Sequence, residues 1–380
     1  MFCVLWIWIW FNVCVSCCCF TTDIKPTSPS LCVIEWTTVT VAKETPRKVR
    51  VSLGSAIALG LFEGKLDAEP ATAYLMTYKR GKCAANCGFC PQARKSLGRA
   101  DMLSRISWPA FRTEKVLSGI AKAAGEGKIK RACIQALNYP EVFAHLLGLA
   151  SAIRQNAKIP ISISCQPLKS ENIKRLAEAG VERIGIPLDA ATEKLFDQVK
   201  GSSVEGPYTW ENQFKLLDEA VSVFGRGKVS THLIVGLGET EKEIVSIIQR
   251  CVDMGILPAL FAFTPIRGTA LEDNPQPQIE KYRRVQIVRY LIVNEIVRYD
   301  DVRFDTEGGI SDFGVEKKAL TRIIGSGKPF LTSGCPNCNR PYYNEKPSGP
   351  IYNYPRAIGQ QELAEIERQL SSRGEQNVEN

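Results

Sequence analysis

The sequence predicts an α/β protein, built as a closed (β/α)8 barrel of the TIM type with a cysteine-containing C-terminal extension. Three observations support this prediction. Short β-branched runs alternate with amphipathic helical patterns, about eight such units fit the chain, and three cysteines follow the first run closely. The 380 residues, 44% hydrophobic and 23% charged, can bury one large core.

The strand and helix patterns set the order of the expected barrel. Eight runs are expected to form buried parallel strands, at Ala73–Thr77, Lys130–Gln135, Pro160–Ser164, Arg183–Pro187, Val229–Val235, Leu260–Phe263, Val302–Asp305 and Pro329–Thr332. Helices are expected between them at Glu141–Asn156, Ser170–Ala179, Trp210–Phe224, Glu241–Met254 and Ile279–Val297. A barrel places its chemistry at the carboxyl ends of the strands, so candidate residues are sought there.

The first 50 residues are expected to lie outside the fold. Phe2–Phe20 is uncharged, rich in Trp, Phe, Val and Cys, and near the lower limit for a membrane span. It lacks an initial basic residue and a small-residue cleavage pattern, and export would expose the cluster cysteines described below to oxidation. We therefore expect a wrongly assigned start or a disordered leader over 1–50, a barrel over 51–332 and a C-terminal cluster-binding segment and tail over 333–380.

The charge favours an acidic partner. The net charge is +8 and the isoelectric point is near 8.8, yet no run of Lys and Arg is interleaved with aromatic residues. We expect no nucleic-acid and no membrane partner, and a cytoplasmic location.

The loop after the first predicted strand carries Cys83, Cys87 and Cys90 in the spacing C-x3-C-x2-C. Soft thiolates select iron–sulfur chemistry, and a short irregular loop lets three of them hold one face of a cubane cluster. The fourth iron would stay open for a substrate. A zinc site is the alternative, but it needs a fourth ligand that the loop does not provide.

This loop resembles the signature of the radical S-adenosylmethionine (SAM) superfamily. The resemblance implies a [4Fe-4S] cluster with S-adenosyl-L-methionine, Phe89 packed near the adenine, Asp189 on the SAM side, and Val235 and Gly236 in the strand that supports the adenine. Taken alone, Asp189 could be a helix cap, and Gly-Leu-Gly-Glu-Thr after Val235 could be a tight turn.

Within the superfamily the sequence is most similar to biotin synthase, from about Tyr74 to Phe304. That similarity implies a second, sulfur-donating cluster inside the barrel, with Cys133, Cys165 and Arg303 in the places of two cysteines and an arginine ligand. Ser230 stands where the third cysteine is expected, and a serine oxygen is a poor substitute for thiolate toward iron.

Cys335 and Cys338 follow the predicted eighth strand, in a segment that biotin synthase lacks. In a closed barrel this segment would lie near Cys133 and Cys165, so the four cysteines are expected to hold an auxiliary cluster, [4Fe-4S] by their number. Alternatively, Cys133 and Cys165 are small buried residues, and Cys335 and Cys338 are half of a zinc site. Cys251 lies within a helical pattern and is expected to be inert.

The C-terminal segment also resembles the archaeal-type two-component lipoyl synthases, with the second subunit favoured. This resemblance implies a radical SAM sulfurtransferase that adds sulfur to an octanoyl chain on a protein. Its partners would be an acidic lipoyl carrier domain or a glycine-cleavage H-type protein, a paralogous subunit, and an electron donor such as ferredoxin. The alternatives are a biotin synthase-like sulfurtransferase, a radical SAM enzyme without sulfur insertion, and a non-catalytic iron- or zinc-binding protein.

The two histidines are not assigned to catalysis. His145 lies on an apolar helical pattern and is expected to be structural. His232 lies in the fifth predicted strand and could face the active site.

Overall fold

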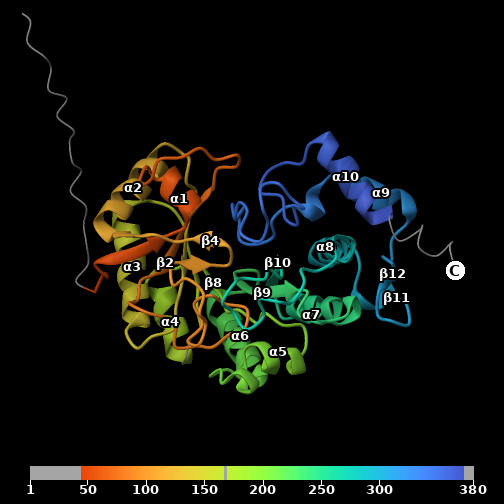
Figure 1. Ribbon diagram of the computed structural model, residues 1–380, viewed down its shortest axis with the longest axis horizontal. Helices are drawn as coiled ribbons and strands as arrows, with labels where there is room; N and C mark the ends of the chain where they lie inside the picture. Colours follow the sequence, from red (N-terminus) through yellow and green to blue (C-terminus); the bar gives the residue numbers. More distant parts are fainter. Residues whose placement is uncertain (1–43, 167–168, 372–380) are drawn as a thin grey trace, which may run out of the picture. The chain divides into compact units, whose positions relative to one another are not determined.

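The computed structural model of the protein describes residues 44–166 and 169–371 (Figure 1). Its central sheet has eight strands in the spatial order β10-β9-β8-β7-β6-β2-β1-β5. Six of them run parallel: β2 (Thr72–Thr77), β6 (Arg131–Gln135), β7 (Ile161–Ser164), β8 (Arg183–Gly185), β9 (Val229–Val235) and β10 (Ile256–Ala262). Each coincides with a predicted strand, although β10 begins at Ile256 rather than Leu260.

Helices pack against these strands and against each other. They are α1 (Leu53–Ala58), α2 (Thr113–Gly125), α3 (Val142–Asn156), α4 (Ser170–Glu178), α5 (Glu193–Val199), α6 (Trp210–Phe224), α7 (Glu241–Asp253), α8 (Ile279–Val293), α9 (Lys317–Gly325) and α10 (Gln360–Ser371), with 3₁₀ helices η1 (Ser202–Val204), η2 (Tyr299–Asp301) and η3 (Lys328–Phe330). The five predicted helices correspond to α3, α4, α6, α7 and α8. The start of α7 is fixed by a capping box in which Thr240 and Glu243 satisfy each other's backbone N–H groups.

Two short antiparallel strands, β1 (Lys48–Val51) and β5 (Ala110–Arg112), extend the β2 edge of the sheet. In β1, Arg50 pairs with Met76 of β2, and Val49 and Val51 are fully buried. The domain boundary expected at Arg50 therefore falls inside a strand of the sheet, and the folded part begins before it. The stretch Phe2–Phe20 and the rest of the leader up to residue 43 lie outside the described residues.

The closed eight-stranded barrel is not what the structure shows. The run predicted at Val302–Asp305 forms β11 (Arg303–Phe304), which pairs with β12 (Ile310–Asp312) in a separate sheet, as β3 (Met102–Leu103) does with β4 (Ile106–Ser107). The run predicted at Pro329–Thr332 forms η3 and one isolated bridge from Leu331 to Tyr354. Pro329 has no N–H to give to a ladder, and the tight turn from Gly327 breaks the extended path.

Polypeptide from the C-terminal segment links the two sides of this open sheet. At the β10 edge, Leu260 N donates to Ser333 Oγ (2.8 Å). At β2, Thr72 Oγ1 donates to Asn337 O (2.8 Å), and Asn339 N donates to Tyr74 Oη (3.0 Å). Residues 333–339 are therefore fixed from both sides.

A buried arginine holds the chain beyond this link. Arg283 of α8 is fully buried, and its Nη1 donates to Tyr352 O (2.7 Å) and to Gln286 Oε1 (2.8 Å). Gln286 Nε2 donates to the same carbonyl (2.9 Å).

Within residues 44–166 and 169–371, no helix is long and apolar enough to cross a membrane.

Candidate functional site

One cavity of about 270 Å³ joins the strands of the open sheet to the C-terminal segment. Its wall is built by β2, β6, β9 and β10, by the loop after β2, and by residues 334–344. The register of the sheet places Tyr74 of β2 opposite Cys133 of β6, and both line the cavity. Side chains one residue away in each strand, such as Leu75 and Ile134, point into the buried core instead.

The first cysteine group is Cys83, Cys87 and Cys90, which all line this cavity. The loop is closed at its base, where Cys83 N donates to Gln92 O (2.8 Å), and it is tied to α5, where Gly88 N donates to Val199 O (2.8 Å). These contacts hold the three thiols at one end of the cavity.

Burial keeps the thiols of Cys87 and Cys90 protonated in the absence of a metal. It raises the pKa of Cys90 to about 12, and it also raises the pKa of Cys87. Thiolates at these positions therefore need a neighbouring cation, and iron provides one.

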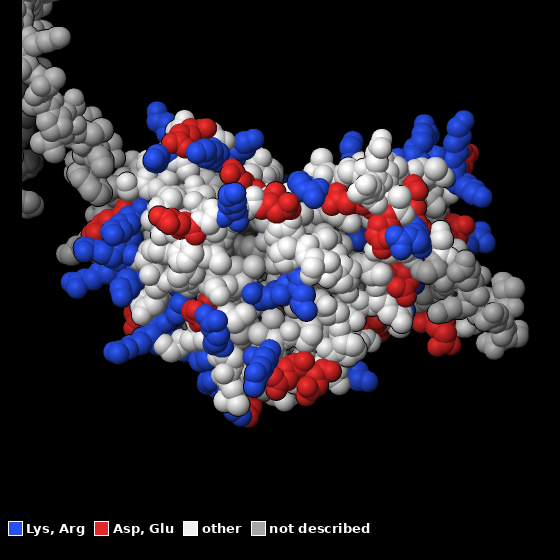
Figure 2. Space-filling model, turned by 45° about the horizontal axis from the view of Figure 1, so that its top comes forward, with Lys and Arg blue, Asp and Glu red and all other residues white. Residues whose placement is uncertain are grey.

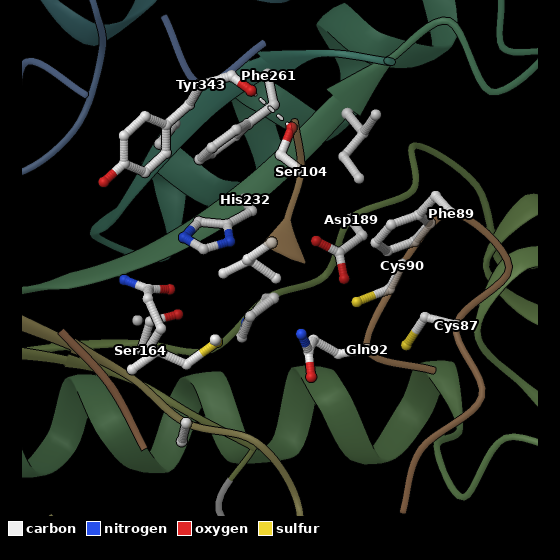
Figure 3. A pocket seen from close by; sticks show the side chains of 18 of the residues that line it. Cys87, Phe89, Cys90, Gln92, Ser104, Ser164, Asp189, His232, Phe261 and Tyr343 are labelled. Atoms are coloured by element: carbon white, nitrogen blue, oxygen red, sulfur yellow. Dashed lines mark hydrogen bonds between the residues drawn. The ribbon is translucent and has the colours of Figure 1, made fainter. Parts of the chain in front are cut away.

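Asp189 lies beside Cys90 at the carboxyl end of β8 (Figure 3). It has a left-handed φ of 70°, and its backbone N donates to His232 O (2.8 Å). Its Oδ2 accepts a hydrogen bond from Lys200 Nζ (2.6 Å), and Lys200 is itself buried next to the rings of Phe196 and Tyr208. Sequence reasoning missed Lys200, because a lysine directly after a helix normally indicates only a basic C-terminal turn.

Phe89 lines the cavity together with Asp189, but Val235 and Gly236 do not. They line a neighbouring pocket, whereas Ile234 of the same strand faces the cavity. Gly236 has a φ of 104°, and its N–H donates to Glu239 Oε1 (2.6 Å). The turn after β9 therefore has a clear structural role, and side-chain alternation separates its residues from the cavity.

The second cysteine group is Cys133, Cys335 and Cys338, from β6 and the C-terminal segment. Tyr74 Oη donates to Cys338 Sγ (3.5 Å). Burial raises the pKa of Cys133, and the thiols of Cys335 and Cys338 raise it further, which places the three sulfurs near one another. All three line the same cavity as the first group.

Cys165 and Ser230 also line the cavity. Burial alone raises the pKa of Cys165 to about 12, with no contribution from another thiol. Its convergence with the second group stays a prediction.

Arg303 does not reach the site. It is exposed in β11, outside the cavity, which corrects the position implied by the resemblance to biotin synthase. The arginine that does line the cavity is Arg340, whose Nη1 donates to Cys338 Sγ (3.2 Å). No sequence signal distinguished Arg340, because its contact with Cys338 depends on a local turn and on β2.

His232 faces the cavity from β9, and its ring lies 4.8 Å from that of Phe261 (Figure 3). Burial lowers the pKa of His232 to about 4, so the imidazole is neutral at pH 7.

The two residues that were expected to be structural or inert do not line this cavity. His145 is hydrogen-bonded to Tyr139 Oη (2.8 Å), and Cys251 is fully buried in α7.

The cysteine groups differ from a site for one metal ion. Within the two described ranges, no three His, Cys, Asp or Glu side chains are arranged to hold a single ion. A cluster is bound through several irons, so its thiolates stand farther apart than the ligands of one zinc. Three thiols around the end of a cavity fit this requirement, and their soft sulfur donors match iron–sulfur chemistry.

Comparison with known proteins agrees with this donor set. Residues 80–251 match the model of the radical SAM superfamily. Residues 80–251 thus resemble a radical SAM domain, a kind of domain that holds a [4Fe-4S] cluster with S-adenosyl-L-methionine, and this stretch contains Cys83, Cys87 and Cys90.

Its relatives in sequence include biotin synthases. The chain is 24% identical over 264 residues to biotin synthase from Gloeothece citriformis, which covers 66% of this chain and 69% of the relative. It is 27% identical over 248 residues to biotin synthase from Lysinibacillus sphaericus, which covers 63% and 70%. The predicted similarity to biotin synthase is thereby confirmed at low identity.

Solved structures with a similar chain path include two further proteins. One is the FeFe-hydrogenase maturase HydG from Carboxydothermus hydrogenoformans, at 15% identity and a TM-score of 0.47, covering 58% of this chain and 51% of that one. The other is methylornithine synthase (PylB), at 13% identity and a TM-score of 0.46, covering 64% and 67%.

Proposed function

We propose that the protein is a radical SAM sulfurtransferase of the lipoyl synthase type, which inserts sulfur into an octanoyl chain attached to a carrier protein. The observation that supports this most strongly is that two separate cysteine groups face one cavity. The first group would hold the SAM cluster, and the second would hold an auxiliary iron–sulfur cluster that donates sulfur.

With both clusters bound, reductive cleavage of SAM provides a radical that removes hydrogen from carbon, and the auxiliary cluster provides sulfide. The chain itself would position the reactants. Lys200 holds the Asp189 carboxylate in place at the first group. His232, which is neutral at pH 7, lies in the wall between Asp189 and Phe261.

The cavity suits an alkyl substrate. Apart from the cysteines, its wall is mostly apolar and includes Met76, Leu137, Ile163, Phe261 and Phe263. Among the described residues that line it, the Lys, Arg, Asp and Glu side chains are Lys200, Arg340 and Asp189, and Lys200 and Asp189 pair with each other. An uncharged chain of methylene groups can enter such a space at little desolvation cost.

The proposed partners follow from this substrate. A carrier domain with an acidic surface would complement the net charge of +8. Figure 2 shows Lys and Arg side chains, interspersed with Asp and Glu, around a largely uncharged central area on one face. A paralogous subunit and an electron donor such as ferredoxin complete the proposal.

A biotin synthase-like activity is the second candidate, because the relatives at about 25% identity are biotin synthases. The two candidates differ in substrate. The protein, loaded with iron and sulfide, should be incubated with SAM, a reductant and either octanoyl-lysine carrier or dethiobiotin. We expect mass spectrometry to find sulfur added to the carrier, with the paralogous subunit present where needed. Sulfur added to dethiobiotin, with the carrier unaltered, would decide for the second candidate.

A further inference from the structure

Arg340 has an unusual set of partners for a half-buried guanidinium. Its Nη1 donates to Cys338 Sγ (3.2 Å) and its Nη2 donates to Ser333 O (2.8 Å). The guanidinium carbon lies 4.1 Å from the centre of the Phe261 ring. The side chain also lines the cavity, so it is available to a molecule bound there.

Among the described residues, no carboxylate forms an ion pair with this cation. The Glu345 carboxylate interacts with Arg340 from beyond ion-pair distance, and it accepts hydrogen bonds from Asn353 N (2.9 Å) and from Asn344 N (3.2 Å). The group that directly contacts the guanidinium and can carry negative charge is the sulfur of Cys338 (3.2 Å). A negatively charged sulfur, or an anion bound beside it, would therefore be stabilised by Arg340.

The backbone is strained so as to present this side chain. Asn337 (φ 66°), Arg340 (φ 32°) and Tyr342 (φ 58°) all have positive φ, which residues other than glycine rarely adopt. Such strain persists only where surrounding contacts impose it. Here Tyr74 Oη accepts hydrogen bonds from the backbone N of Asn339 (3.0 Å) and of Arg340 (2.9 Å).

Cys133 of β6 lines the same cavity as Cys335, Cys338 and Arg340. The pKa of its thiol is raised by Cys335 and Cys338 and lowered by Arg340.

We propose that Arg340 is part of the site formed by the second cysteine group. It acts as a positioning residue, because it fixes the Cys335–Cys338 turn and supplies positive charge to an anionic iron–sulfur species held by Cys133, Cys335 and Cys338. This inference rests on the auxiliary cluster of the proposed function.

The test uses a background in which Cys83, Cys87 and Cys90 are all replaced by Ala, so that iron at the second group is measured alone. In this background we expect iron and sulfide to remain bound. In this background, Arg340→Gln should increase the rate at which a chelator removes the iron by about tenfold or more, because loss of a contact that supports a metal ligand typically weakens metal binding by that factor. Arg340→Lys keeps the charge but not the planar fork of the guanidinium. Its rate of iron removal should lie between those of the background and of Arg340→Gln, and its electron paramagnetic resonance (EPR) signal should be altered.

Two controls make the result specific. Arg303→Gln, on exposed β11, and Cys251→Ala, in the core of α7, should both leave the rate of iron removal and the EPR signal of the second group unchanged. Thermal unfolding of each variant checks that it is folded. If Arg340→Gln does not fold, the comparison of Arg340→Lys with Arg303→Lys decides by the same two measurements.

Two outcomes would overturn the inference. Unchanged iron retention and EPR signal in both Arg340 variants would remove Arg340 from the site. Absence of iron from the triple-Ala background would refute the auxiliary cluster itself, and so the proposed function, before Arg340 is tested.

Discussion

At the residue scale, the chemistry of the first cysteine group depends on burial. The thiols of Cys87 and Cys90 stay protonated in this environment until a metal offsets the cost of charge. These cysteines could be predicted from the sequence because all of them lie within one loop, at a recognisable spacing. The sequence did not indicate Lys200 or Arg340, whose partners are brought close by the fold.

Cys83→Ala, Cys87→Ala and Cys90→Ala should each abolish reductive cleavage of SAM, because two thiolates cannot hold the cubane cluster in place. The measurement is 5′-deoxyadenosine formed in the presence of a reductant. Cys251→Ala is the matched control, since Cys251 lies in the core of α7, and it should keep this activity. Cleavage that survived in any of the three variants would refute the assignment of the first group.

His232 should make the stability of the cluster-free protein depend on pH. Its pKa is about 4 in the folded state because of burial, against an ordinary value of 6.5. Between pH 4 and pH 6.5 the unfolded chain binds a proton at this histidine and the folded chain does not. The folded state therefore has its full stability above pH 6.5 and loses stability as the pH falls toward 4.

The expected loss from this histidine between pH 7 and pH 5 is roughly 2 kcal/mol of unfolding free energy. His232→Gln should lack it. Urea unfolding of both proteins at the two pH values gives the comparison. An equal loss of stability in the two proteins would show that His232 is not held neutral by the fold.

At the element scale, strand and helix patterns predicted the parallel part of the sheet but not its edges. The buried runs from β2 to β10 are strongly apolar, and their period and length are local properties. β1 was missed because its residues were assigned to the leader, although the alternation of charged and apolar residues in Lys48–Val51 is itself a strand pattern. The last two predicted strands do not join the central sheet, because the run at 302–305 pairs with β12 instead and Pro329 interrupts the other run.

A variant beginning at Glu44 should fold like the full chain, whereas one beginning at Val51 should not. The second lacks most of β1, and with it the pairing of β1 with β2 and with β5, as well as the fully buried Val49. We expect a thermal midpoint lower by several degrees, since loss of one buried valine alone costs about 2 kcal/mol. Equal midpoints for the two variants would show that β1 contributes nothing.

At the scale of the whole molecule, the cavity depends on contacts between distant parts of the chain. The hydrogen bond from Tyr74 to Cys338 joins residues 264 positions apart. The cysteine motifs could be found in the sequence, and barrel topology indicated that they would approach each other. Which cysteines meet depends on how residues 333–344 cross the open sheet, and that path follows from tertiary hydrogen bonds rather than from a local pattern.

The central claim is that the second cysteine group provides the sulfur. Its most direct test replaces both Cys335 and Cys338 with Ala and measures, in one reaction, sulfur added to the octanoyl carrier and 5′-deoxyadenosine formed from SAM. We predict that the ratio of added sulfur to 5′-deoxyadenosine falls to zero, because radical formation no longer leads to sulfur transfer. An unchanged ratio, with normal thiolation of the carrier, would contradict the account.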